Sequence, residues 1–156
     1  LPFSSEIQML KKEKKFIMFE KNKWIKLKEL EIINKKDYNF RKIFKYFLKI
    51  KYKWGGKTFD GIDCSALLQI FYKYNNKFFP RDTKDQVKIK KGVNNKKLFK
   101  KGDIIFWKGH VAICLNKREL IHAYGPKKKV LIMPIIKTIK LIEKTAKLKV
   151  IKIISI

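Results

Sequence analysis

Three side chains of this 156-residue chain have the types that perform acyl transfer: Cys64 and the only two histidines, His110 and His122. Such chemistry needs a thiolate that attacks, an imidazole that moves the proton, and a third group that orients the imidazole. A single histidine in an apolar stretch is usually a packed structural residue. Two histidines downstream of one cysteine, at separations of 46 and 12 residues, favour the catalytic interpretation.

The residues around Cys64 predict that it opens a helix. It lies in the polar stretch Gly61-Ile62-Asp63-Cys64-Ser65, and apolar residues then recur at i, i+4 and i+7 as far as Tyr74. The pattern predicts a helix over residues 64–74, with Asp63 as its N-cap. Free backbone N–H groups in a first helical turn favour a thiolate and can donate to an oxyanion.

The second cysteine, Cys114, lies in an apolar run at residues 111–115. Two cysteines are too few for a disulfide scaffold. The apolar run favours Cys114 as a small buried hydrophobic residue. A disulfide with Cys64 stays open as the alternative.

The chemistry-bearing residues need elements that bring them together. Helical patterns are expected from about residue 40, capped by Asp37 and ending before Trp54, and around residues 136–145. Strands are expected at residues 103–107, 110–115, 119–124, 130–133 and 148–154. Strands joined by short connections commonly pair antiparallel, which brings His122 beside His110. Helices first and antiparallel strands later indicate an α+β fold.

The N-terminal residues differ in pattern from the rest. Short strands are expected at residues 7–10, 16–19 and 24–27, separated by lysine-rich turns. We expect an N-terminal β extension at residues 1–36 and a catalytic domain at residues 37–156.

The net charge of +27 results from 40 Lys and Arg against 13 Asp and Glu. Such a charge bears on partners and not on fold. An AT-rich codon bias explains it, and binding to anionic envelope polymers is the functional alternative. The lysines are spread along the chain without a nucleic-acid motif, which disfavours a specific nucleic-acid partner. No run approaches the roughly 20 apolar residues of a membrane helix.

Six ordered motifs resemble the NlpC family of papain-like cysteine peptidases, over roughly residues 40–154. They are Tyr52-Lys53-Trp54-Gly55-Gly56, Gly61-Ile62-Asp63-Cys64-Ser65, Pro80-Arg81-Asp82-Thr83 with Gln86, Gly102-Asp103-Ile104-Ile105-Phe106-Trp107, Gly109-His110-Val111 and Ile121-His122-Ala123. The resemblance implies a papain-like fold, with the nucleophile at the N-terminus of a helix packed on an antiparallel sheet that carries the catalytic histidines.

By position in these motifs, the resemblance implies a role for each catalytic residue. Cys64 is the nucleophile, His110 is the general base, and His122 orients His110. Tyr52 resembles the family tyrosine that stabilises the oxyanion.

The resemblance also implies substrate contacts. Asp63 and Ser65 match positions that read the free amine end of a stem peptide. Arg81 matches a motif near the site, and a purely structural arginine is the open alternative. Ala66 departs from the glycine found in many relatives. Trp54 and Trp107 are interpreted as packing residues.

A weaker resemblance concerns the first residues. The sequences Leu1-Pro2-Phe3-Ser4 and Lys23-Trp24-Ile25-Lys26 are similar to the later half of a bacterial Src-homology-type barrel.

The function implied is hydrolysis of the amide between D-Glu and a diamino acid in peptidoglycan stem peptides. No metal or cofactor is required, since no third histidine or cysteine pair is present for zinc. The alternatives are an inactive wall-binding module, and an amidase or acyltransferase acting on another amide.

A cell-envelope location is expected, periplasmic or secreted, with cytoplasmic recycling as the alternative. The residues after Leu1 do not form a signal peptide.

Overall fold

A five-stranded antiparallel sheet forms the centre of the protein, whose computed structural model describes residues 1–31 and 39–155. The strand order is β10-β6-β7-β8-β9. The strands are β6 (Asp103–Trp107), β7 (His110–Cys114), β8 (Glu119–Tyr124), β9 (Lys129–Pro134) and β10 (Lys152–Ser155). β6 and β7 form a tight hairpin in which Trp107 pairs with His110, and Gly109 has a φ of +73°. That left-handed conformation is the reason for glycine in the turn.

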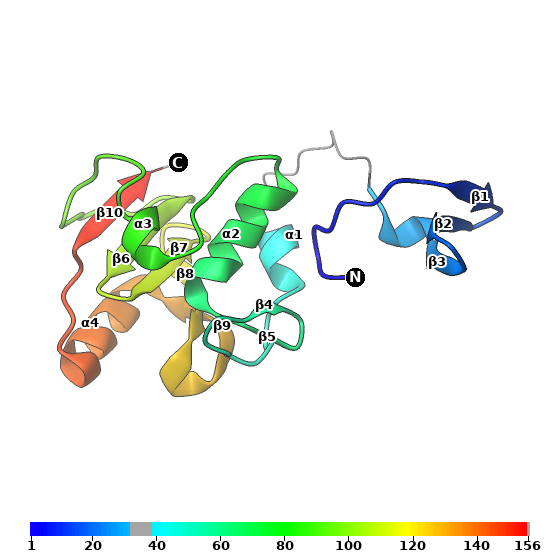
Figure 1. Ribbon diagram of the computed structural model, residues 1–156. Coiled ribbons are helices and arrows are strands. Elements are labelled where there is room, and N and C mark those ends of the chain that lie inside the picture. The colour runs from blue at the N-terminus through cyan, green and yellow to red at the C-terminus, as the bar shows by residue number, and fades with distance from the viewer. Residues whose placement is uncertain (32–38, 156) are drawn as a thin grey trace.

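Each face of the sheet packs against helices. Val111, Ile113 and Ile121 belong to the core that includes α2 (Cys64–Tyr74) and α1 (Phe40–Lys45). The alternate residues, such as Ala112 and Leu120, pack with α4 (Ile135–Ala146). The alternation follows from the period of two along a strand. The result is the expected α+β architecture, in which α1 and α2 lie side by side (Figure 1).

The structure corrects several predicted boundaries. α1 ends at Lys45, earlier than predicted, and Asn39 caps it by accepting a hydrogen bond from the Lys42 N–H at 3.3 Å. The proposed cap Asp37 lies outside the described residues. β10 begins at Lys152, later than predicted. The described residues also form three short elements that were not predicted, namely α3 (Thr83–Gln86), β4 (Lys57–Thr58) and β5 (Gly61–Ile62). They form two 3₁₀ turns as well, η1 (Leu27–Glu29) and η2 (Gly125–Lys127).

The N-terminal residues form a separate three-stranded sheet beside the main body (Figure 1). Its strands are β1 (Lys11–Glu13), β2 (Phe16–Glu20) and β3 (Lys23–Lys26). The strand predicted at residues 7–10 is therefore wrong, since β1 starts after it. The predicted boundary between residues 36 and 37 falls outside the described residues and stays a prediction.

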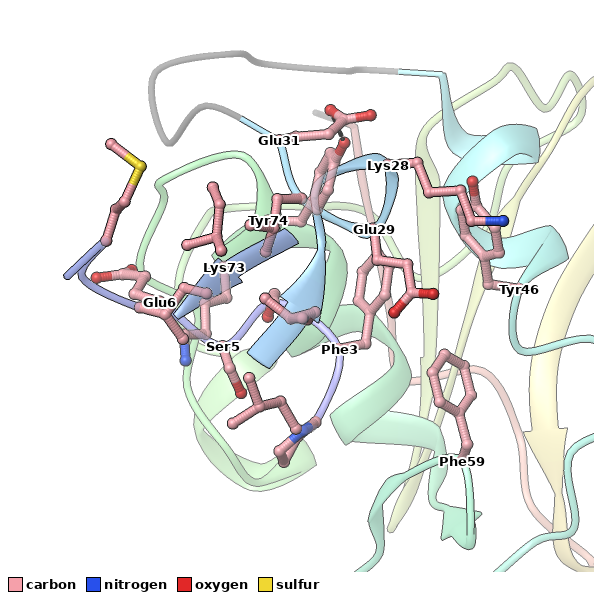
Figure 2. A pocket seen from close by; sticks show the side chains of 18 of the residues that line it. Phe3, Ser5, Glu6, Lys28, Glu29, Glu31, Tyr46, Phe59, Lys73 and Tyr74 are labelled. Atoms are coloured by element: carbon pink, nitrogen blue, oxygen red, sulfur yellow. Dashed lines mark hydrogen bonds between the residues drawn. The ribbon is translucent and has the colours of Figure 1, made fainter. Parts of the chain in front are cut away.

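Phe3 joins this N-terminal segment to the body. Its ring stacks on Tyr74 with centroids 5.4 Å apart and meets Phe47 edge-on at 5.4 Å. A pocket of about 760 Å³ lies where the two parts meet, and Figure 2 shows Phe3, Tyr74 and Phe59 among its lining. Cys64, His110 and His122 do not line this pocket, so it is distinct from the candidate active site.

Candidate active site

Cys64 is the first residue of α2, as the sequence predicts. Asp63 precedes it with extended backbone (φ −100°, ψ 176°), and its Oδ1 accepts the Ala66 N–H at 2.8 Å. This is a regular N-cap, in which the Asp63 side chain satisfies one of the free N–H groups of the first turn. The thiol also has hydrogen-bonding partners in the Thr83 side chain and in the backbone of Val111 and Ser65.

Burial sets the protonation state of Cys64. The residue is 4% exposed, and this burial raises the pKa of the Cys64 thiol, an effect that the hydrogen bonds from Val111, Thr83 and Ser65 reduce but do not cancel. The sequence-based expectation that the helix start lowers this pKa is thus wrong for the free protein, because desolvation is the larger effect. The resting group is a neutral thiol.

The two histidines meet through strand pairing. β7 and β8 pair with Ile113 opposite Ile121 and Cys114 opposite Leu120. This register brings His110 Nε2 to 2.9 Å from His122 Nδ1. His110 opens β7, one residue before the Val111 backbone group that contacts Cys64. The contact with His122 occupies His110 Nε2, so the second ring nitrogen, Nδ1, is the one that remains for another partner.

Both imidazoles are neutral near pH 7. Burial lowers the pKa of His110 to about 4. Burial, and then the neighbouring His110, lower the pKa of His122 to about 3. His122 has no exposed surface, and its ring stacks on Tyr124 at a centroid distance of 4.7 Å and an angle of 11°.

Tyr52 lies near Cys64. Its backbone forms a bridge to Ile62, and its N–H donates to the Lys128 carbonyl at 2.8 Å. Burial raises the pKa of the Tyr52 phenol, and the negative charges of Asp63 and of Cys64 in its thiolate form raise it further. The phenol therefore stays protonated and can donate a hydrogen bond.

Asp63 is the centre of a second network. Arg81 contacts both of its oxygens, with Nη2 at 2.5 Å from Oδ2 and Nη1 at 3.1 Å from Oδ1. Ser65 Oγ donates to Oδ1 at 3.1 Å and accepts from Arg81 Nη1 at 2.8 Å. The Gly55 N–H donates to Oδ2 at 2.9 Å. Both oxygens thus have donors already, and an incoming ammonium group must share or displace them.

Two residues near the site were not assigned roles by sequence reasoning. Thr83 contacts the thiol, although it was noted only as part of the motif that contains Arg81. Gln86 is fully buried, and its Nε2 donates to the carbonyls of Ser65 and Pro80, each at 2.9 Å. It therefore ties the first turn of α2 to the segment that carries Arg81.

Trp54 and Trp107, the two tryptophans interpreted as packing residues, differ in their exposure. Trp107 is fully buried, as predicted for a packing residue. Trp54 is 86% exposed, so its interpretation as a packing residue is wrong. Trp54 lies in a tight turn with Gly55, whose φ is +74°.

The structure also bears on the disulfide alternative, on metal binding and on membrane-spanning helices. Cys64 and Cys114 are both free, which contradicts the disulfide alternative. Burial, and then the charge of Asp103, raise the pKa of Cys114 to about 12, so this thiol is protonated at neutral pH. Among residues 1–31 and 39–155 there is no cluster of three His, Cys, Asp or Glu side chains that could hold a metal. In the same part of the chain, no helix is both long and apolar enough to cross a membrane.

The chain is similar to known proteins in sequence and in fold. The gamma-D-glutamyl-L-lysine dipeptidyl-peptidase of Bacillus subtilis (strain 168) is 33% identical over 102 residues, covering 60% of this chain and 34% of that protein. The murein DD-endopeptidase MepS/murein LD-carboxypeptidase of Escherichia coli (strain K12) is 31% identical over 80 residues, covering 47% of this chain and 42% of that protein. The crystal structure of an NlpC/P60 family protein from Bacillus cereus ATCC 10987 superposes with a TM-score of 0.68 at 24% identity, covering 82% of this chain and 48% of that one.

This chain therefore spans less than half the length of each of these proteins. The superposition establishes the papain-like fold. The sequence model of the NlpC/P60 family matches residues 49–144, and this segment is well over half of the 156 residues. The protein belongs to the NlpC/P60 family.

Proposed function

We propose that this protein is a cysteine peptidase that hydrolyses the amide between D-Glu and the diamino acid of peptidoglycan stem peptides. The observation that carries the proposal is the 2.9 Å contact between His110 Nε2 and His122 Nδ1. His110 directly precedes Val111, whose backbone contacts Cys64. A nucleophile, a base and an orienting group in this order make a cysteine peptidase site. The names of relatives that act on gamma-D-glutamyl and murein bonds support the substrate class.

The mechanism starts from a neutral pair. As Cys64 Sγ attacks the carbonyl carbon, its proton moves to His110 Nδ1, and the carbonyl oxygen becomes an oxyanion. The Tyr52 hydroxyl and the first-turn N–H groups of α2 are the donors for that oxyanion. The His110 imidazolium then gives its proton to the leaving amine, and the thioester forms. A water activated by His110 hydrolyses the thioester and restores the thiol.

Asp63, Ser65 and Arg81 form the substrate-binding part of the proposal. Asp63 is 5% exposed, whereas the side chain of Arg81 is 23% exposed, so the network reaches the surface through Arg81. Asp63 and Ser65 hold Arg81 in place, and a substrate amine approaches the carboxylate only alongside the guanidinium.

The location and the wider partner follow from the same proposal. A stem-peptide hydrolase acts in the cell envelope, periplasmic or secreted, or on recycled fragments in the cytoplasm. Anionic envelope polymers are the proposed second partner. Lys51 lies directly opposite Lys129 across a β-bridge, and both are exposed. Like charges at opposite positions repel, and a polyanion relieves that repulsion.

The first experiment follows cleavage of L-Ala-γ-D-Glu-diaminopimelate by mass spectrometry. The proteins are the wild type, Cys64→Ala and the matched control Cys114→Ala. We expect cleavage after D-Glu by the wild type and by Cys114→Ala, and none by Cys64→Ala. Equal cleavage by Cys64→Ala would overturn the mechanism.

A second set of substrates separates the alternatives. A γ-D-Glu-L-Lys peptide and a cross-linked muropeptide test the diamino acid and the bond. Cleavage of the cross-link alone would replace the proposed bond by a DD-amide. If Cys64 is alkylated by iodoacetamide but no wall peptide is cut, another amide is the substrate. If Cys64 is also unreactive, the protein is a wall-binding module.

The polymer partner has its own test. Wild type, Lys51→Gln/Lys129→Gln and the control Lys11→Gln/Lys12→Gln, which changes exposed residues of the N-terminal segment, are sedimented with cell walls at rising salt. We expect the first pair alone to weaken binding to walls that carry phosphate polymers. Equal weakening by both pairs, or tighter binding to duplex DNA, would count against a specific surface.

A further inference from the structure

Met133 provides a contact to the histidine pair that the proposed mechanism has not used. It lies on β9, where Met133 pairs with Leu120 and Leu131 pairs with His122. Met133 is therefore diagonal to His122 on the same face of the sheet, a distance that a long side chain can cross. Its Sδ lies 3.4 Å from His122 Nε2.

The contact determines which nitrogen of His122 carries the proton. A thioether sulfur accepts hydrogen bonds and has no proton to donate. The contact is a hydrogen bond only if His122 Nε2 is protonated. His122 is fully buried, so bulk water does not reach the ring to accept a hydrogen bond from Nε2 in place of the sulfur.

The consequence passes through His122 to the base. A neutral imidazole has one protonated nitrogen, so His122 Nδ1 is then an acceptor. His110 Nε2, 2.9 Å away, must donate to it. His110 Nδ1 is then left with a free electron pair that can accept a proton. In the opposite tautomers, His110 Nδ1 carries the proton and cannot act as a base. The lone pair of His122 Nε2 would then face the Met133 sulfur.

We propose that Met133 is a positioning residue, whose thioether selects the tautomers of His122 and His110 in which His110 Nδ1 can accept the Cys64 proton. The stack of His122 on Tyr124 keeps the ring in the orientation that this requires. The inference rests on the proposed roles of His110 and His122, but the tautomers themselves can be measured without any substrate.

The test uses protein labelled with ¹⁵N-histidine, because the chain has only two histidines and hence two imidazoles. Long-range ¹H–¹⁵N correlation spectra distinguish Nδ1–H from Nε2–H rings. In the wild type at pH 7 we expect both rings as Nε2–H. A wild-type His122 protonated at Nδ1 would overturn the proposal directly.

Two substitutions of similar volume then separate tautomer selection from packing. Met133→Leu keeps the apolar bulk and removes the acceptor, whereas Met133→Gln offers a carbonyl oxygen. We expect Nδ1–H signals to appear in Met133→Leu and to recede in Met133→Gln. If the inactive tautomers reach half of the population or more, kcat/KM falls by about two- to tenfold, and Met133→Gln recovers it.

Several outcomes contradict the proposal. Unchanged Nε2–H tautomers in folded Met133→Leu would show that the sulfur does not select them. Equal losses of kcat/KM in the Leu and Gln variants, without a change of tautomer, would leave Met133 a packing residue. If no peptide is cleaved by any variant, the function proposal fails while the spectra still decide the tautomers.

Discussion

The ion pair between Asp63 and Arg81 gives the sharpest stability prediction. Arg81→Met removes both guanidinium contacts from a carboxylate that is 5% exposed. Removing one partner of a buried pair costs about 3–5 kcal/mol, because the other charge stays buried. Asp63 keeps three donors, namely the N–H groups of Gly55 and Ala66 and the Ser65 hydroxyl. We therefore expect the lower end of the range, about 3 kcal/mol.

The assay is thermal and urea unfolding at pH 7. For a chain of this size, about 3 kcal/mol corresponds to a fall in Tm of roughly 6–12 °C. Asp63→Asn should cost less, since Arg81 has a partly exposed side chain that can turn to water. The double variant should be more stable than Arg81→Met alone, because it no longer buries an unpaired charge. A Tm of Arg81→Met within about 2 °C of wild type would refute the reasoning.

Three further predictions concern protonation and the sheet edge. The rate of Cys64 alkylation by iodoacetamide should keep rising with pH above 8, because burial raises the pKa of this thiol, and a plateau near pH 6 would indicate a resting ion pair instead. The free energy of unfolding, measured in urea, should fall as the pH is lowered from 6.5 to 5. The pKa values of His110 and His122 are lowered to about 4 and about 3, so the unfolded chain binds more protons than the folded chain in this range. A flat profile would contradict this. Lys96→Met removes a 2.6 Å contact to the fully buried Asp103 and should lower hydrogen-exchange protection in β10, whereas the surface variant Lys97→Met should not.

The sequence was sufficient for the residues whose patterns are local. The N-cap and apolar spacing placed Cys64 at the start of α2, since both signals lie within one helix. The short connections between strands predicted the antiparallel pairing that brings His122 beside His110. The six motifs then indicated the papain-like fold.

Properties that depend on surroundings were not readable in this way. The pKa of Cys64 is raised by burial under residues far away in sequence, so the helix start alone predicted the wrong direction. Trp54 was assigned to packing from its residue type, but its position before the Gly55 turn leaves it at the surface. The contact between His122 and Met133 depends on the register of β8 and β9.

Asp63 connects these parts of the site. Its carboxylate caps the helix that presents Cys64, receives the Gly55 N–H of the loop that follows Tyr52, and holds Arg81. One buried group therefore fixes the proposed nucleophile, the proposed oxyanion donor and the proposed substrate contact. The histidine pair is fixed independently, by the pairing of β7, β8 and β9. The proposed mechanism starts from a neutral thiol and a neutral imidazole, so the proposed attack requires that these two frameworks bring Cys64 Sγ and His110 Nδ1 together when the proton moves. In the proposed mechanism, the activity of the site then depends on how rigidly α2 packs on β7.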